Sequence, residues 1–327
     1  MDFKTQYSFF LQQIENRILE VIPQSAPNEL YEPFRYIMKE GGKRLRPVIT
    51  LIGCGIAGED PLKALDSAVA IEILHNFTLV HDDIMDNSPL RRGRQTIHEK
   101  WNSAIAILTG DVMIGYAYKL LPSSTNHSRA DEILSIFSKE LIEVCEGQVF
   151  DMVFNEKKDV TIADYINMID KKTARLIETS AVIGAHIGFG DSIEIDAMKN
   201  IAHNIGLAFQ IQDDLLDMTA NQADFGKKIG KDVVEGKKTY LILKAVELVN
   251  DTLDRQLIDK FMNNNGLDEC EVIDMDNLFR KYRIYETAQC EIDKYFATAE
   301  SFYPKLKKNM YTDMLKWLVS SINKRII

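Results

Sequence analysis

The sequence is poor in the residues that make turns and in any ordered pattern of cysteines. Its 327 residues include only 17 glycines and 8 prolines, which favours long helices over a turn-rich β architecture. The four cysteines show no CxxC spacing, so neither a zinc site nor a disulfide framework is expected. Scattered cysteines of this kind fit a reducing compartment, and we expect the protein to be cytoplasmic.

Membrane segments and nucleic-acid binding are also not indicated. The first six residues lack the charged-then-apolar layout of a signal peptide. The longest apolar candidate, residues 68–80, is interrupted by Glu72, His75 and Asn76, so no membrane span is expected. The net charge of −10 argues against a nucleic-acid partner. It also means that an anionic substrate would need something to offset the acidic charge.

The apolar residues recur at helical spacing in segments such as 68–78, 134–148 and 202–212. Alternating strands, repeats and low-complexity linkers are not evident. Breaks are expected at 41–42, 58–61, 87–89, 122–124 and 263–266. The pattern predicts a single all-α domain over residues 1–327, with ten or more helices.

Two DDxxD clusters are present, Asp82-Asp83-Ile84-Met85-Asp86 and Asp213-Asp214-Leu215-Leu216-Asp217. In a helix, the first and third aspartates share a face, and the second lies about 100° round from the first. Pro89 disfavours helical geometry at Ser88, so the first helix should end just after its aspartates. The apolar period is lost at 219–222, which predicts the same for the second helix.

Carboxylates at a helix C-terminus repel one another and the negative end of the helix dipole. A hard divalent cation removes that penalty, and magnesium takes aspartate oxygens while keeping waters and substrate phosphates. One such cluster alone would be explained by a solvated helix end. The two together predict a multi-metal clamp, in which bound magnesium would also offset the acidic charge facing an anionic substrate.

Cations accompany both clusters. Residues 41–47 place three cations beside a glycine turn, residues 91–94 hold three arginines, Lys172 lies in a predicted helix, and residues 226–231 hold three lysines. Arginine offers forked donors to phosphate oxygens, and lysine offers a point charge. Singly, each stretch would be solvated surface. Because GxxxxGK[ST] and GxGxxG are both missing, metals and side chains would hold phosphates here.

Taken in order, these motifs resemble the trans-isoprenyl diphosphate synthases (polyprenyl synthetases) from about Tyr31 through Tyr240. The matching elements are GGKRLRP at 41–47, LHNFTLVHDDIMDNSPLRRG at 74–93, LTGD at 108–111, GQ at 147–148, KKTARL at 171–176, GLAFQIQDDLLD at 206–217 and GKKIGKDVVEGKKTY at 226–240. So many ordered motifs make the match specific. The region after about Asn250 adds little to it.

The resemblance implies an isoprenoid synthase-type helical bundle around a deep central cavity, usually in a homodimer. It implies isopentenyl diphosphate and an allylic diphosphate as substrates, three Mg²⁺ ions, and a reaction of ionisation, condensation and elimination. It also implies that the groups carrying catalysis are Asp82, Asp83, Asp86, Lys172, Asp213 and Lys227.

Ligand roles follow from the same resemblance, position by position. The metal ligands would be Asp82, Asp86 and Asp213, supported by Asp83, Asp214 and Asp217. Contacts to the allylic diphosphate would come from Arg91, Lys172 and Lys227, with Gln210 and Lys237 near it. The isopentenyl diphosphate pocket would hold Lys43, Arg46, His75 and Arg92.

Product length is expected to depend on Phe77 and Thr78, five and four residues before Asp82. Five helical residues place Phe77 about 7 Å deeper along the helix than the metal site. An ordinary core aromatic is one reading of Phe77. The resemblance implies instead a cavity floor that stops elongation early. One aromatic before an unexpanded DDxxD is similar to archaeal-type geranylgeranyl diphosphate synthases, so twenty carbons are expected, with a fifteen-carbon farnesyl product as the main alternative.

Two other classes of protein compete with this reading. A terpene cyclase would share the fold and the first motif, but would normally replace the second DDxxD. A non-catalytic subunit of a heteromeric synthase generally loses one of the two motifs. Both motifs are intact here, and Lys43, Arg46 and Arg92 argue further against a cyclase.

Overall fold

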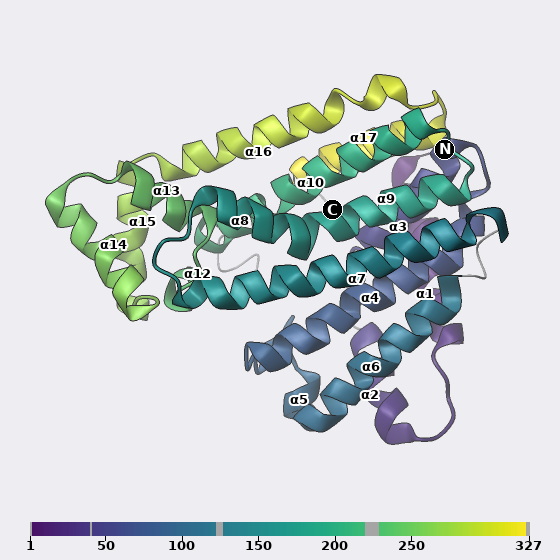
Figure 1. Cartoon of the computed structure of the whole chain (residues 1–327), viewed down its shortest axis with the longest axis horizontal. Coiled ribbons are helices and arrows are strands. Elements are labelled where there is room, and N and C mark those ends of the chain that lie inside the picture. Colours follow the sequence, from purple (N-terminus) through teal and green to yellow (C-terminus); the bar gives the residue numbers. More distant parts are fainter. Residues whose placement is uncertain (1, 40, 122–126, 220–228, 325–327) are drawn as a thin grey trace. The chain divides into compact units, whose positions relative to one another are not determined.

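The computed structural model describes residues 2–39, 41–121, 127–219 and 229–324. Within these ranges the regular structure is helical except for one two-stranded ribbon (Figure 1). The α-helices are α1 (Phe3–Val21), α2 (Asn28–Met38), α3 (Leu45–Ala57), α4 (Leu65–Met85), α5 (Ile97–Lys100), α6 (Ser103–Leu120), α7 (His127–Glu156), α8 (Ile162–Ile169), α9 (Arg175–Ile187), α10 (Ser192–Thr219), α12 (Lys231–Val234), α13 (Tyr240–Leu248), α14 (Thr252–Asn264), α15 (Val272–Lys281), α16 (Ile284–Glu300) and α17 (Met310–Asn323). The predicted all-α class is confirmed.

The remaining elements are short. The strands are β1 (Leu90–Arg91) and β2 (Arg94–Gln95), paired antiparallel. Single turns of tighter helix occur at η1 (Pro61–Ala64), η4 (Glu269–Glu271) and η5 (Tyr303–Lys305), and a π-helical turn, η3, spans Asp170–Ala174.

The chain forms two compact units. Unit 1 comprises Met1–Ile142, Leu176–Ala202 and Ser301–Ile327, and unit 2 comprises Glu143–Arg175 and His203–Glu300, each within the described ranges. Helices α7 and α10 contribute residues to both units. The single functional domain expected over the whole chain stays a prediction.

The core of unit 1 is built around α3 and α4, which are buried on nearly every side. Helix α4 packs against α1, α2, α3 and α6. A helix that is apolar all round must be enclosed by others in this way. Helix α9 comes close to α3, because a Cβ at Gly184 would lie 2.1 Å from the carbonyl oxygen of Thr50.

In unit 2, α13 is the enclosed helix, packed against α8, α14 and α16. Its first residue, Tyr240, is buried with its ring 6.3 Å from that of Tyr165 on α8. Large buried side chains such as Phe261 and Phe279 fill the rest of this core.

The first acidic cluster lies where the sequence predicts, at a helix C-terminus: α4 ends at Met85 with Asp86 as its C-cap residue. The second cluster lies on α10, which the structure describes through Thr219. None of the described helices combines the length and apolar character that a membrane crossing requires.

Candidate active site

The three aspartates of the first acidic cluster differ in solvent exposure. Asp83 is only 2% exposed, and its Oδ1 accepts hydrogen bonds from Arg91 at 2.8 Å. Burial raises the pKa of Asp83, and the Arg91 guanidinium opposes that rise. Asp82 is half-buried and Asp86 is exposed. Asp82 and Asp86 are therefore the accessible carboxylates, while Asp83 holds Arg91 in place.

Arg91 and Arg92 sit on the β1–β2 ribbon, which the sequence pattern does not predict. Arg92 and Gly93 form its two-residue turn with φ angles of 49° and 78°. Positive φ at both turn residues matches the twist of a tight hairpin. Arg92 Nη1 donates to the carbonyl of Gly41 at 3.0 Å, so the ribbon reaches the 41–47 segment.

That segment brings further cations to α4. Arg46 Nη1 lies 3.3 Å from Nε2 of His75. Burial, then the charge of Arg46 and of neighbouring arginines including Arg92, lower the pKa of His75 well below its usual value. His75 is therefore neutral at pH 7 and can accept from Arg46. So many arginines acting on one imidazole define a positive region suited to an anion.

Arg44, the third cation of this segment, points into the protein. It is buried and pairs with Glu15 and Glu72 at 2.7 Å, and its Nη2 donates to the carbonyl of Met38. From the sequence it counts among the three cations of the segment and is given no role in the site. Glu72, an acid within an apolar helix, was the available signal, because a buried carboxylate needs a partner.

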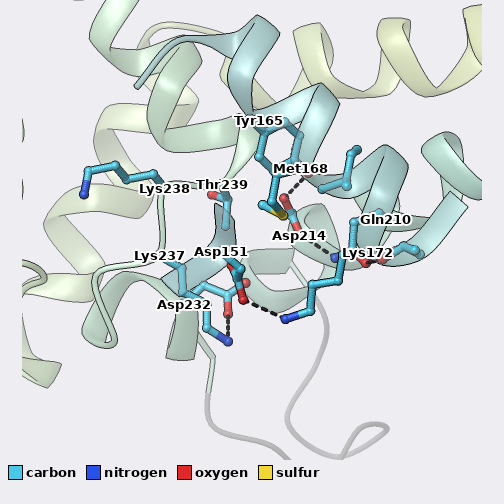
Figure 2. A pocket seen from close by; sticks show the side chains of 12 residues that line it. Asp151, Tyr165, Met168, Lys172, Gln210, Asp214, Asp232, Lys237, Lys238 and Thr239 are labelled. Atoms are coloured by element: carbon cyan, nitrogen blue, oxygen red, sulfur yellow. Dashed lines mark hydrogen bonds and ion pairs between the residues drawn. The ribbon is translucent and has the colours of Figure 1, made fainter. Parts of the chain in front are cut away.

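Unit 2 contains a small polar cavity of about 120 Å³ (Figure 2). Its lining combines four predicted site residues with groups that were not selected from the sequence. The lining residues are Asp151, Tyr165, Met168, Ile169, Lys172, Thr173, Gln210, Asp214, Asp232, Lys237, Lys238 and Thr239.

The aspartates of the second acidic cluster also differ in solvent exposure, with the middle one buried. Asp214 is 6% exposed and accepts hydrogen bonds from the Tyr165 hydroxyl (2.6 Å), Gln210 Nε2 (3.1 Å) and the Tyr240 backbone N–H (3.4 Å). Burial and the Asp232 carboxylate raise the pKa of Asp214 to about 8. Asp213 and Asp217 are half-buried. The middle aspartate of each motif is thus an anchor, and the outer two remain accessible.

Two of the three lysines that line the cavity face carboxylates that were not selected from the sequence. Lys172 Nζ lies 2.7 Å from Asp151 Oδ2, and Lys237 Nζ lies 3.7 Å from Asp232 Oδ1 (Figure 2). No local pattern marks Asp151 as a partner of Lys172, since 21 residues separate them. Lys227, the remaining predicted lysine, lies outside the described residues.

Lys172 lies in the π-helical turn η3, between α8 and α9, where the sequence predicts an ordinary helix. Turns of this kind are frequent at functional sites. A Cβ added at Gly147 would lie 2.5 Å from the backbone N of Lys172, and one at Gly206 would lie 2.5 Å from Cα of Ala174. The two glycines therefore allow α7 and α10 to press against the turn that presents Lys172.

We expect Gly147→Ala to lower the free energy of unfolding by about 1–3 kcal/mol, because the new methyl group meets backbone that must shift. Helix propensity alone would favour alanine by about 1 kcal/mol. Gly115→Ala on α6 is the control, since a Cβ there meets nothing within 4 Å. Urea unfolding of both variants checks this, and a stabilised Gly147→Ala protein would contradict the close approach.

The donor atoms present suit magnesium. Among the described residues, no three His, Cys, Asp or Glu side chains converge into a metal centre. Magnesium usually takes only one or two carboxylates, and completes its octahedron with waters and substrate phosphates. Asp82 and Asp86 on α4, and Asp213 and Asp217 on α10, supply accessible oxygens of this type.

Phe77 is buried within unit 1. Its ring centroid lies 4.6 Å from that of His81, at an interplanar angle of 63°. His81 in turn lies against Gly110 of α6, where an added Cβ would be 2.2 Å from its Nε2. Thr78 is half-buried and donates its hydroxyl to the carbonyl of His75 at 2.8 Å. Phe77 is therefore fixed by a packed contact between α4 and α6.

Helix-borne carboxylates with an arginine cluster and a lysine cavity define a class of enzyme that binds diphosphates with the help of metal ions. Comparison with known proteins makes this specific. The profile of the Polyprenyl synthetase family matches residues 27–275, and the chain belongs to that family.

Similar proteins are named as prenyl diphosphate synthases. It is 40% identical over 235 residues to a geranylgeranyl diphosphate synthase of Methanosarcina mazei, covering 72% of each chain. It is 38% identical over 249 residues to a geranylfarnesyl diphosphate synthase of Natronomonas pharaonis, covering 71% of this chain and 73% of that one. The crystal structure of geranylgeranyl pyrophosphate synthetase from Pyrococcus horikoshii matches with a TM-score of 0.93 and 35% identity, over 99% of this chain and 98% of that one.

These findings confirm the family, the isoprenoid synthase fold and the enzyme class predicted from the sequence. The chain is a prenyltransferase that makes short-chain prenyl diphosphates from isopentenyl and allylic diphosphates, with a divalent metal. The roles of individual site residues stay predictions.

Proposed function

We propose that this enzyme makes geranylgeranyl diphosphate, the twenty-carbon product. The observation that carries the proposal is the placement of Phe77. It is buried on α4 and held by His81, five residues before Asp82, a rise of about 7 Å. The relative from M. mazei bears the name of a twenty-carbon synthase, and that from N. pharaonis the name of a twenty-five-carbon synthase.

Within this proposal, unit 2 binds the allylic diphosphate. Lys172 and Lys237 would exchange their carboxylate partners for phosphate oxygens, and Gln210 would be held by Thr173, whose hydroxyl donates to Gln210 Oε1 at 3.0 Å. Fixed cations of this kind stabilise charge that develops on a leaving group. Magnesium, when bound, would supply further charge neutralisation to the departing diphosphate.

Unit 1 supplies the pocket for isopentenyl diphosphate in this proposal. Lys43 is exposed, and the side chain of Arg46 meets the neutral His75. Arg92 extends from the ribbon to Gly41. In this proposal Arg91 keeps its ion pair with Asp83 and also contacts the allylic diphosphate.

The reaction needs no protein nucleophile. The allylic C–O bond breaks, and its electron pair leaves with the diphosphate. The double bond of isopentenyl diphosphate attacks the resulting cation, which forms a carbon–carbon bond and a new cation. Loss of a neighbouring proton restores a double bond, and the released diphosphate is the proposed base. Three magnesium ions per site are part of the proposal, supported by four accessible carboxylates.

The product assay tests the proposal. The purified protein would be incubated with magnesium, isopentenyl diphosphate and, in separate reactions, five-, ten- and fifteen-carbon allylic diphosphates, followed by chromatography of the products. Twenty carbons are the expected end point. Termination at fifteen or at twenty-five carbons would replace the proposed product by a farnesyl or a geranylfarnesyl one.

A homodimer is also proposed, and exposed apolar side chains in unit 1 support it. Ile107 and Leu108 on α6, and Leu134 and Ile142 on α7, are all exposed, and α6 contacts α7 where Tyr118 meets Phe137. Large exposed apolar side chains on neighbouring helices are a feature of interaction sites. The four free cysteines support the cytoplasmic location.

We expect Ile142→Arg to convert the dimer to monomer. A buried, unpaired charge at an interface costs several kcal/mol, which moves the dissociation constant by at least about a hundredfold. Ile273→Arg on α15 is the matched control, because Ile273 is 59% exposed and Ile142 is 60% exposed. Light scattering at micromolar concentration checks both. A monomeric wild-type protein would contradict the dimer.

A further inference from the structure

The backbone that carries Lys43 is held by a side chain from the first helix. The hydroxyl of Tyr7 on α1 donates to the carbonyl oxygen of Lys43. Tyr7 is 6% exposed, and burial, with the Glu72 charge, raises its pKa to about 12. The hydroxyl therefore keeps its proton at any physiological pH and remains a donor.

This hydrogen bond acts where the chain has little restraint of its own. Gly41 and Gly42 precede Lys43 with φ angles of 67° and 128°, and glycine resists rotation least of all residues. Arg44 follows with φ 44° and is fixed by its buried guanidinium. That anchor acts on the side chain of residue 44 and not on the carbonyl of the preceding residue. Tyr7 fixes that peptide through its carbonyl oxygen.

Tyr7 is itself supported by the last helix of the described chain. Its ring lies 5.9 Å from that of Trp317 on α17, at 65°, and Phe3 also contacts Trp317 at 6.3 Å. Edge-on aromatic pairs of this geometry are favourable. Helices α1 and α17 thus meet at the residue that holds the Lys43 peptide.

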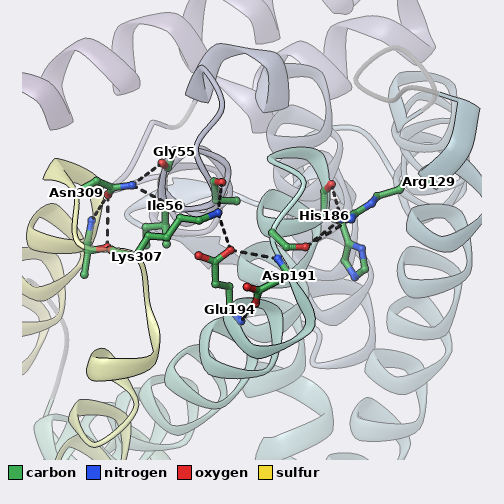
Figure 3. Close-up of polar contacts among 11 residues, drawn as sticks. Gly55, Ile56, Arg129, His186, Asp191, Glu194, Lys307 and Asn309 are labelled. Carbon is green, nitrogen blue, oxygen red and sulfur yellow. Dashed lines mark hydrogen bonds and ion pairs between the residues drawn. The ribbon is translucent and has the colours of Figure 1, made fainter.

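Helix α17 is attached to the C-terminal end of α3, the helix that carries Arg46 in its first turn. Asn309 Nδ2 donates to the carbonyls of Gly55 (3.1 Å) and Ile56 (3.0 Å) (Figure 3). Lys307 Nζ reaches the carbonyl of Ala57 at 2.9 Å and Glu194 at 3.0 Å. These bonds satisfy the open carbonyls of the α3 C-terminus and set the position of α17 along α3.

We propose that Tyr7 is a positioning residue for isopentenyl diphosphate, acting through the Lys43 peptide, with Trp317 as its support. The inference rests on the proposed assignment of Lys43 and Arg46 to that substrate. If it holds, loss of the Tyr7 hydroxyl loosens one diphosphate pocket and leaves the allylic pocket unchanged. The first and last helices would then serve substrate selectivity as well as stability.

The test is Tyr7→Phe, with steady-state kinetics in each substrate. We expect KM for isopentenyl diphosphate to rise about fivefold to tenfold, the usual effect of one hydrogen bond. KM for the allylic diphosphate and kcat at saturation should stay within twofold. Trp317→Leu should raise the KM for isopentenyl diphosphate by a smaller factor. Trp317→Phe keeps an aromatic ring against Tyr7 and should leave this KM close to that of the wild-type enzyme.

Tyr285→Phe on α16 is the matched control. Its hydroxyl also makes one hydrogen bond, to Asp276 Oδ1 at 2.6 Å, within unit 2. It should lower the melting temperature to a similar degree and change neither KM. A Tyr7→Phe protein whose two KM values move together, or do not move, would overturn the positioning role.

Arg46→Ala, measured in parallel, separates the two ideas. A rise in KM for isopentenyl diphosphate supports the pocket assignment. If Arg46→Ala shows that rise and Tyr7→Phe does not, the pocket stands and the role of Tyr7 is wrong. If Arg46→Ala affects only the allylic substrate, the pocket assignment is wrong, and with it the inference drawn from it.

Discussion

Replacing Asp82 or Asp213 with alanine is expected to lower turnover by about 10³-fold or more, because each removes an accessible carboxylate proposed to bind magnesium. Neither change should unfold the protein. Asp82 lies in the last turn of α4, where loss of a negative charge is neutral or stabilising by about 0.3–1 kcal/mol, and Asp213 is only half-buried. Initial rates and circular dichroism melting curves check the two statements separately.

Asp83→Asn provides a sharp contrast to Asp82→Asn, since the two substitutions are identical and adjacent. Asp83 is buried against Arg91, so its loss should destabilise the fold by about 1–3 kcal/mol. Asp82→Asn should leave the melting temperature almost unchanged while removing activity. Near-normal turnover by Asp82→Ala, with an unaltered melting curve, would refute its role as a metal ligand.

The parts of the site that follow from local signals were predictable. Pro89 indicates the end of α4, which lies at Met85. Helical spacing also implies that the middle aspartate points away from the outer two, as Asp83 and Asp214 do. Each of these depends only on residues within a turn or two of the feature.

Other parts depend on distant residues and could not be predicted. The π-helical turn at Lys172 exists where Gly147 and Gly206 allow two other helices to approach. Strands of two residues are too short to show alternation, so the ribbon with Arg92 left no periodic signal.

The contacts of the C-terminal region also depend on distant residues. Lys307 and Asn309 donate hydrogen bonds to carbonyls at the end of α3, some 250 residues earlier in the chain. Trp317 meets Tyr7 near the N-terminus. Contacts between residues so far apart leave no pattern within a single sequence, although they determine where the Lys43 peptide lies.

Phe77→Ala is expected to shift the main product from twenty carbons to twenty-five or more. If Phe77 forms the floor of the elongation cavity, removing its ring opens space about 7 Å beyond the metal ligand, and a further isoprene unit can enter. Phe77→Leu, which removes less volume, should give a mixture with a smaller share of longer chains. Chromatography of dephosphorylated products measures both distributions.

The matched control is Phe261→Leu on α14, which changes an equally large, buried side chain in unit 2. Both leucine variants should lose stability, since large-to-small core substitutions cost about 1 kcal/mol or more. Only the Phe77 variants should alter product length, because only Phe77 is proposed to meet the growing chain. A Phe77→Ala enzyme that is active and still stops at twenty carbons would show that Phe77 is an ordinary core aromatic.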